Sequence, residues 1–151
     1  MPSPLLLRGR RSSLDAVYMI TTVTVLRQRW LAPASAAQGV EAVLRNMDAA
    51  GWTTSLAWVV MPDHLHWLFV LQAGGLSSVV QRAKSCAARS VNAAHARSGA
   101  VWQAGFYDRQ LRADEDLRTL AYYILANPVR SGLAGQVGEY PYAWCYAGTD
   151  P

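Results

Sequence analysis

The hydrophobic pattern in the first half of the chain switches between runs of β-branched residues and helical periodicity. Residues 17–26 (VYMITTVTVL) are rich in β-branched side chains, which predicts a strand. A helix is predicted over 36–50, because four apolar residues recur there at helical spacing: Val40, Val43, Leu44 and Met47. Residues 52–61 and 64–71 predict two more strands, separated by a Pro-Asp turn. Since 64–71 is apolar on both faces, we expect it at the centre of a sheet.

The second half of the chain continues this alternation and adds one helix. Residues 76–96 are alanine-rich and predict a helix, and 101–111 predict a fourth strand. The acidic residues at 114–116 suit the start of a further helix. We expect that helix to run to about Asn127, because Pro128 cannot continue it.

The order of the predicted elements, β-α-β-β-α-β-α, contains a familiar topology. Its first six elements form the split β-α-β arrangement of ferredoxin-like folds. We therefore expect an α+β protein with an antiparallel sheet, two helices on one face, and the extra C-terminal helix, which carries Tyr123, on the other. A single domain is expected over 1–151, with a basic N-terminal arm at 1–14 and an irregular C-terminal tail at 133–151.

The composition excludes several classes of protein. Hydrophobic residues make up 52% of the 151 residues and charged residues only 16%, which rules out a disordered protein. No apolar run approaches the roughly 20 residues that span a bilayer, and residues 1–11 lack the features of a signal peptide. We expect a soluble, cytoplasmic protein without a membrane partner, in which Cys86 and Cys145 are reduced thiols.

Positive charge is concentrated at the N-terminus. Residues 1–30 contain five arginines and one acidic residue, whereas the rest of the chain has nine basic and nine acidic residues. All basic residues except Lys84 are arginines, and the arginine side chain suits bidentate contacts with phosphate. The excess therefore favours a polyanionic partner, and we predict that Arg8, Arg10 and Arg11 contact nucleic acid.

Two histidines, His64 and His66, lie two residues apart on a predicted strand. Side chains alternate across a strand, so both imidazoles point to one face while Leu65 and Trp67 point to the other. Such a pair suits a divalent metal ion, for which imidazole is a common ligand. The alternative is a pair of half-buried histidines that hydrogen-bond to the backbone.

The last predicted helix offers a third ligand and a nucleophile. Tyr123 and Asn127 are four residues apart and share a helix face. An amide oxygen can bind a hard divalent ion, and a tyrosine next to a metal-bound phosphate can act as a nucleophile. Alternatively, Tyr122 and Tyr123 are packing aromatics and Asn127 is a residue of the helix end.

Further arginines are candidates for phosphate contacts. Four polar residues form one face of the helix at 76–96: Arg82, Ser85, Arg89 and Asn92. Arg112 follows the fourth predicted strand. These side chains either contact nucleic acid or form ordinary solvated surface. The sequence has neither a glycine-rich phosphate loop nor a GxSxG motif, so P-loop and α/β-hydrolase chemistry have no support.

An ordered set of segments resembles one known family. The segments are 60–66 (VMPDHLH), 101–103 with Tyr107 and Asp108, Arg112 followed by three acids, 123–124 with 127–133 (NPVRSGL), and 140–142 (YPY). Together they resemble the REP-associated tyrosine transposases, which belong to the single-tyrosine HUH transposases of bacterial insertion sequences. The resemblance extends over almost the whole chain.

This resemblance implies a ferredoxin-like enzyme that cuts and rejoins single-stranded DNA at hairpins of repetitive extragenic palindromes. By position, His64 and His66 would bind a divalent metal, Mg²⁺ or Mn²⁺, and Asn127 would be the third ligand. Tyr123 would be the nucleophile that forms a 5′-phosphotyrosine, and no nucleotide cofactor would be needed. The family implies a bacterial protein that associates with the nucleoid when bound to DNA, as a monomer or a homodimer.

Two residues depart from the family pattern, and other functions stay open. Asp63 stands where asparagine is more usual, and Trp67 stands where a smaller residue is common. A non-catalytic ferredoxin-like module that binds nucleic acid is one alternative function. A metal-dependent hydrolase of small phosphoesters is another, although the basic N-terminal cluster argues against it.

Overall fold

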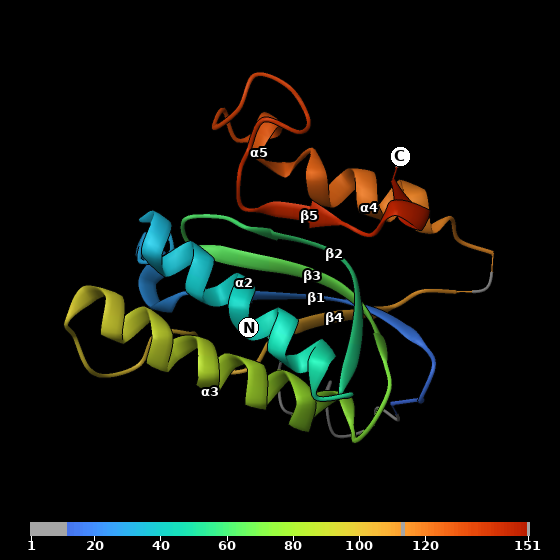
Figure 1. Cartoon of the computed structure of the whole chain (residues 1–151), viewed down its shortest axis with the longest axis horizontal. Helices are drawn as coiled ribbons and strands as arrows, with labels where there is room; N and C mark the ends of the chain where they lie inside the picture. The colour runs from blue at the N-terminus through green and yellow to red at the C-terminus, as the bar shows by residue number, and fades with distance from the viewer. Residues whose placement is uncertain (1–11, 113, 151) are drawn as a thin grey trace.

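The computed structural model describes residues 12–112 and 114–150, and its centre is a five-stranded antiparallel sheet with the order β4-β1-β3-β2-β5 (Figure 1). The strands are β1 (Val17–Val23), β2 (Thr53–Val60), β3 (His64–Leu71), β4 (Tyr107–Gln110) and β5 (Ala143–Cys145). The central position of β3 is confirmed. Its nearly continuous apolar sequence suits a strand that is covered on both faces.

Helices cover both faces of the sheet (Figure 1). The helices are α2 (Ala34–Ala49), α3 (Leu76–His95), α4 (Leu117–Leu125) and α5 (Asn127–Arg130), with 3₁₀ turns η1 (Val25–Arg27) and η2 (Ala147–Thr149). α2 and α3 pack together on one face, and α4 packs on the other face against β2, β3 and β5. The expected ferredoxin-like arrangement with an extra C-terminal helix is confirmed.

The two faces of the sheet have separate apolar clusters. The larger cluster lies under α2 and α3 and includes Ile20, Trp58, Trp67 and Phe69. The smaller cluster lies under α4 and includes Leu68 and Ile124. At about 25 cal/mol per Å² of apolar surface, burial on two faces is a large stabilising term for a domain of this size. It also fixes which way each residue of β3 points.

The first and fourth strands are shorter than predicted. β1 ends at Val23, and the chain then forms η1, in which Leu26 has a left-handed backbone (φ 55°). Of the predicted strand 101–111, only Tyr107–Gln110 forms a ladder, while Trp102 makes an isolated bridge with Thr24. β-branched residues favour extended backbone, but a ladder also needs a partner strand at the right register.

The last helix is also divided differently from the prediction. α4 begins at Leu117, where the side chain of Asp116 accepts a hydrogen bond from the Arg118 backbone, and it ends at Leu125. Pro128 does not stop the helical region, because it lies in the first turn of α5. Proline is tolerated there because the first backbone N–H groups of a helix have no partner within it.

The prediction of an irregular tail over 133–151 is wrong in part. β5 pairs with the edge of β2, and the rings of Trp58 and Trp144 stack with centroids 4.6 Å apart. The Tyr140 hydroxyl donates a hydrogen bond to the Val60 carbonyl at 2.7 Å. The aromatic residues of the tail thus pack against the sheet, and their burial stabilises a strand of only three residues.

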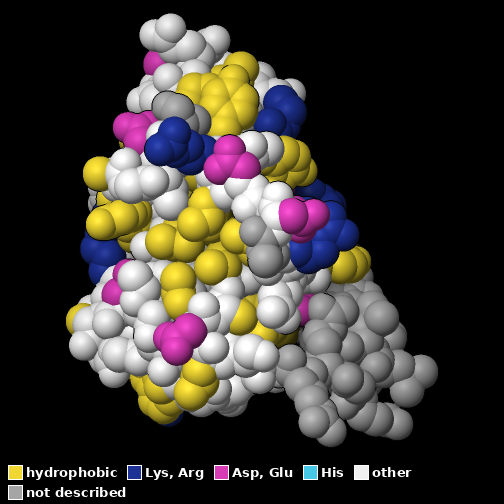
Figure 2. Space-filling model, turned by 90° about the vertical axis from the view of Figure 1, so that its right-hand side faces the viewer, with side chains coloured by type: hydrophobic (Ala, Val, Ile, Leu, Met, Phe, Trp, Pro, Cys, Tyr) yellow, Lys and Arg dark blue, Asp and Glu magenta, His cyan; other side chains and the backbone are white. Residues whose placement is uncertain are grey.

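Acidic and basic side chains share the surface. Figure 2 shows Lys or Arg next to Asp or Glu on one face of the molecule. Arg112 has Asp114 and Glu115 as ionic partners, at 3.7 and 3.5 Å, and Arg109 also pairs with Glu115.

Within 12–112 and 114–150, no helix is long and apolar enough to cross a membrane.

Candidate active site

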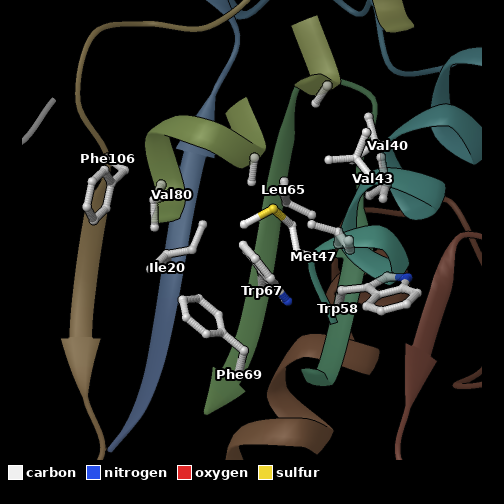
Figure 3. Packing of buried hydrophobic residues seen from close by; sticks show 14 of the residues in the cluster. Ile20, Val40, Val43, Met47, Trp58, Leu65, Trp67, Phe69, Val80 and Phe106 are labelled. Atoms are coloured by element: carbon white, nitrogen blue, oxygen red, sulfur yellow. The ribbon is translucent and has the colours of Figure 1, made fainter. Parts of the chain in front are cut away.

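A tight hairpin places the histidine pair. The Met61 backbone N–H donates to the His64 carbonyl at 2.8 Å, so Pro62 and Asp63 form the connection between β2 and β3. Leu65 and Trp67 point into the cluster under α2 and α3 (Figure 3). His64 and His66 consequently face α4, and their ring centroids lie 4.9 Å apart. The predicted common orientation of the imidazoles is confirmed.

Each imidazole is held through its Nδ1 atom. His64 Nδ1 lies 2.7 Å from Asp63 Oδ1, and His66 Nδ1 lies 2.8 Å from Thr21 Oγ1. These partners are side chains rather than the backbone groups that the alternative interpretation required. Among the described residues, neither Nε2 atom has a hydrogen-bond partner. A ligated histidine typically uses one nitrogen for the metal and the other for an orienting hydrogen bond, and this pair fits that pattern.

The electrostatics favour a neutral His66 and an ionised Asp63. Burial, together with the charges of His64 and Arg130, lowers the pKa of His66 to about 4. Burial opposes ionisation of Asp63, but its interactions with His64 and Arg27 outweigh this, so its pKa lies below the usual value. At pH 7, His66 is therefore in the form that binds a metal ion.

Helix α4 brings Tyr123 to this pair. The Tyr123 ring lies at an angle to the His66 ring, with centroids 6.3 Å apart, and the residue is 46% exposed. Tyr122 is also exposed, but it lines a groove with residues of β5 such as Trp144. The structure thus brings Tyr123, rather than its neighbour, together with the two histidines.

Asn127 is the first residue of α5, one turn after Tyr123, and is buried. Its Oδ1 accepts a weak hydrogen bond from the Ser131 hydroxyl at 3.5 Å. Within the part of the chain that the structure describes, Asn127 makes no hydrogen bond with either histidine. Its amide therefore keeps donor and acceptor capacity that no other described residue uses.

The donor set suits a mixed nitrogen and oxygen site. No group of three or more His, Cys, Asp or Glu side chains among the described residues is arranged to hold a metal ion. The two Nε2 atoms, which have no partner among the described residues, and one amide oxygen nevertheless form a mixed nitrogen and oxygen donor set. Such a set suits Mn²⁺ better than Mg²⁺, which prefers oxygen ligands, and either ion takes further oxygens from water or substrate. The residues present fit such an ion.

Arg130 is a site residue that the sequence interpretation missed. Its guanidinium lies over the Tyr123 ring, 4.3 Å from the centroid, and donates a hydrogen bond to the Tyr123 carbonyl at 2.7 Å. The spacing of seven residues, which puts both residues on one face of a continuous helix, was the available signal. The proline between them obscured it, because it suggested that the helix ends.

The other predicted DNA contacts do not join this site. Arg82 stacks on Trp52 at 4.8 Å, and Arg89 contacts the Cys86 sulfur at 3.3 Å. Both belong to α3, on the sheet face opposite to the histidines. Asn92, predicted on the same polar face, hydrogen-bonds to the Gly99 carbonyl and to Arg97 at the end of α3. Arg112 has the acidic partners described above.

Three of the predicted DNA contacts belong to the N-terminal arm. Arg8, Arg10 and Arg11 lie outside the described residues.

The remaining histidine, His95, has a structural role, because its Nε2 atom lies 2.6 Å from the Trp30 carbonyl. Trp67, noted above as a departure from the family pattern, is buried away from the site and donates to Ser55 Oγ at 2.9 Å.

The fold and the histidine–tyrosine arrangement define a ferredoxin-like α+β protein with a candidate phosphoryl-transfer site. A model of the family described as "Transposase IS200 like" matches residues 12–127. The chain therefore belongs to this family.

Individual relatives agree with the family match. A REP-associated tyrosine transposase of Escherichia coli (strain K12) is 30% identical over 87 residues, which cover 58% of this chain and 51% of that protein. A protein of Haemophilus influenzae is 28% identical over 100 residues, which cover 59% of this chain and 57% of that protein. This chain thus spans about half the length of the curated relatives it matches.

A solved structure, that of a REP-associated tyrosine transposase bound to a REP hairpin, shares the fold. It superposes with a TM-score of 0.72 at 24% identity, and the match covers 89% of this chain and 79% of that one. The resemblance to REP-associated tyrosine transposases that the sequence motifs indicated is confirmed.

Proposed function

We propose that this protein is a metal-dependent transesterase that cuts and rejoins single-stranded DNA next to hairpins of repetitive extragenic palindromes. The observation that carries the proposal is the proximity of Tyr123 to the histidine pair, with ring centroids of Tyr123 and His66 6.3 Å apart. The orienting partners of both imidazoles contact Nδ1, and no described residue hydrogen-bonds to either Nε2 atom. The proposed site thereby combines a nucleophile with ligands for a metal ion that would bind the phosphate.

Tyr123 is the nucleophile in this proposal. Its phenolic oxygen forms a bond to the phosphorus atom, and the bond from phosphorus to the 3′ oxygen breaks. The phenolic proton passes through solvent to the departing oxygen, which leaves a free 3′-hydroxyl and a 5′-phosphotyrosine. The tyrosine ester retains the phosphodiester bond energy, so rejoining requires no nucleotide cofactor. Holding Tyr123 close to the phosphate supplies much of the rate enhancement.

His64, His66 and Asn127 would hold the divalent ion. A bound Mg²⁺ or Mn²⁺ would polarise a phosphoryl oxygen and neutralise charge that develops on the phosphate. The carboxylate of Asp63 accepts from Nδ1 of His64 and so favours the tautomer with an available Nε2, while Thr21 orients the His66 ring through its contact with Nδ1. The low pKa of His66 keeps that ring neutral and available as a ligand.

The substrate assignment rests on the relatives and on charge. A protein of the same fold has been solved bound to a REP hairpin, and the excess of positive charge in this chain lies in residues 1–30. We infer that this segment contacts the hairpin phosphates. We also propose that the protein acts on chromosomal DNA in the bacterial cytoplasm. The single-stranded flank then lies at the histidine–tyrosine site.

A covalent adduct tests the proposal. Incubation with a hairpin oligonucleotide and Mn²⁺ should give a protein–DNA species that survives a denaturing gel. Tyr123→Phe should abolish the adduct and leave DNA binding nearly unchanged, whereas the matched Tyr122→Phe variant should retain it. An adduct that persists in Tyr123→Phe contradicts the assignment of the nucleophile. DNA binding without any adduct in the wild type would support the non-catalytic alternative.

A further inference from the structure

Arg130 holds an unusual position beside the candidate nucleophile. One terminal nitrogen of its guanidinium donates to the Tyr123 carbonyl at 2.7 Å, while the guanidinium carbon lies 4.3 Å from the centroid of the Tyr123 ring. Two independent contacts thus fix the cation against one residue. The ring lies in turn next to His66, with centroids 6.3 Å apart.

The local backbone explains how the arginine returns to the tyrosine. α4 ends at Leu125, and α5 begins at Asn127 with Pro128 in its first turn. Arg130, the last residue of α5, therefore reaches a carbonyl of the final turn of α4. Such carbonyls lack a partner within their own helix, so a basic side chain here is stabilising.

The contact with the end of α4 uses only part of the hydrogen-bonding capacity of Arg130. A guanidinium has five N–H donors, and the contact with Tyr123 uses one of them. Arg27, Arg109 and Arg112 each have a carboxylate partner. Across residues 12–112 and 114–150, no carboxylate lies within ion-pair distance of Arg130, and the residue is exposed. A cation held in place with unused donors is suited to bind an anion.

We propose that Arg130 is a phosphate-binding residue of this site, which contacts the non-bridging oxygens of the phosphate that Tyr123 attacks. The assignment rests on the proposed function for the identity of the anion. The guanidinium approaches the phosphate from α5, whereas the histidines approach it from β3. The remaining N–H groups match the geometry of two phosphate oxygens. They stabilise the negative charge on these oxygens as the bond between Tyr123 and phosphorus forms.

Binding alone provides the first test. Tyr123→Phe protein, which keeps an aromatic ring under the guanidinium, is titrated with one oligonucleotide that ends in either a 5′-phosphate or a 5′-hydroxyl. We expect the terminal phosphate to strengthen binding about tenfold, because it adds a charge-assisted hydrogen bond. Arg130→Gln in the same background should remove most of this preference. Arg118→Gln, which removes an exposed arginine from the start of α4, is the matched control and should retain it.

Single-turnover kinetics provide the second test. At saturating oligonucleotide, Arg130→Gln should slow adduct formation by about 100-fold, as expected for loss of a donor to developing charge. Arg130→Lys, which keeps the charge but loses the planar fork, should recover part of the rate. The melting temperature of both variants should stay close to that of the wild type. A rate equal to the wild type in Arg130→Gln, or a phosphate preference that does not depend on Arg130, would overturn the inference.

The two tests separate this inference from the proposed function. Absence of an adduct in the wild type, with a phosphate preference that depends on Arg130, would reject the transesterase and support the phosphate site. Normal adduct formation, with a rate and a phosphate preference that do not change in Arg130→Gln, would support the transesterase and reject the phosphate site.

Discussion

The Nδ1 atom of His64 lies 2.7 Å from Oδ1 of Asp63, the residue directly before it in the chain. The second oxygen of the same carboxylate accepts a hydrogen bond from Arg27 Nε at 3.1 Å. Asp63 therefore joins the histidine to η1, a segment 36 residues away along the chain. The departure from the more usual asparagine at this position keeps an oxygen acceptor for His64 and adds a charge that binds Arg27.

Replacing Asp63 should weaken metal binding without removing a ligand. In Asp63→Ala, His64 loses its orienting partner, so we expect Mn²⁺ affinity to fall by about 10–100-fold, as for other partners of metal-bound histidines. Asp63→Asn retains an oxygen acceptor and should lose less. Calorimetric titration with Mn²⁺ measures the effect, with the exposed Asp114→Ala as control. Equal affinities in Asp63→Ala and the wild type would show that Asp63 does not support the site.

Metal removal should stop cleavage reversibly. We expect excess chelator to abolish formation of the covalent adduct and added Mn²⁺ to restore it, because the ion neutralises charge on the phosphate. His64→Ala and His66→Ala should stay inactive at the Mn²⁺ concentration that restores the wild type. His95→Ala, which alters a histidine bonded to a backbone carbonyl, should retain activity. Full cleavage in excess chelator would refute the role of the metal.

Lys84 should make stability depend on pH in the alkaline range. Burial lowers its pKa to about 8, although its ammonium group donates to the Gln103 and Gly105 carbonyls. Between about pH 8 and the usual lysine value near 10.4, the unfolded chain binds more protons than the folded one at this residue. The contribution of Lys84 to stability therefore rises with pH in that window and is lowest below pH 8.

Urea denaturation at pH 7 and pH 10 measures this contribution as the difference between the wild type and Lys84→Met. The wild type should gain stability relative to the variant on going to pH 10. The free energy of unfolding of the wild type minus that of the variant should therefore rise from pH 7 to pH 10, and a difference that falls or stays constant would contradict the burial of a titrating lysine.

Trp144 should be a stabilising residue of the sheet rather than part of a dispensable tail. Its ring stacks on Trp58, whose Nε1 donates to Glu41 at 2.9 Å. Because Trp144 is only half-buried, we expect Trp144→Ala to lower the free energy of unfolding by about 2 kcal/mol, less than for a fully buried tryptophan. Tyr146→Ala, at an exposed aromatic residue, is the control. The midpoints of chemical denaturation compare the two, and an equal, small effect would show that β5 contributes little.

The arginines of the N-terminal arm should act on DNA affinity. Replacing Arg8, Arg10 and Arg11 by alanine should weaken hairpin binding and flatten its salt dependence. Each lost phosphate contact should reduce the log–log slope by about 0.7–0.9. Binding measured by fluorescence anisotropy across salt concentrations gives the slope. An unchanged slope with a large drop in melting temperature would instead assign these residues to the fold.

Much of the fold could be predicted because local patterns follow from backbone geometry. The alternation of side chains along a strand is sufficient to orient His64 and His66 toward one face. The helical repeat predicts that Tyr123 and Asn127 share a face, although Ala126 separates α4 from α5 in the structure. The bounds of β3 and α3 agree closely with the predicted ranges. Both features depend only on residues close together in the chain.

The sequence by itself thus determined the ferredoxin-like order of elements and the residue types of the candidate site, whereas the tertiary structure decided which residues contact one another. The contact of Arg27 with Asp63, the stacking of Trp144 on Trp58 and the position of Tyr123 beside His66 join segments that are far apart along the chain. No local periodicity encodes such contacts, because they depend on how packed layers meet across the sheet. The contact of Arg130 with Tyr123 is a further example. It depends on the break between α4 and α5, which residue spacing alone does not reveal.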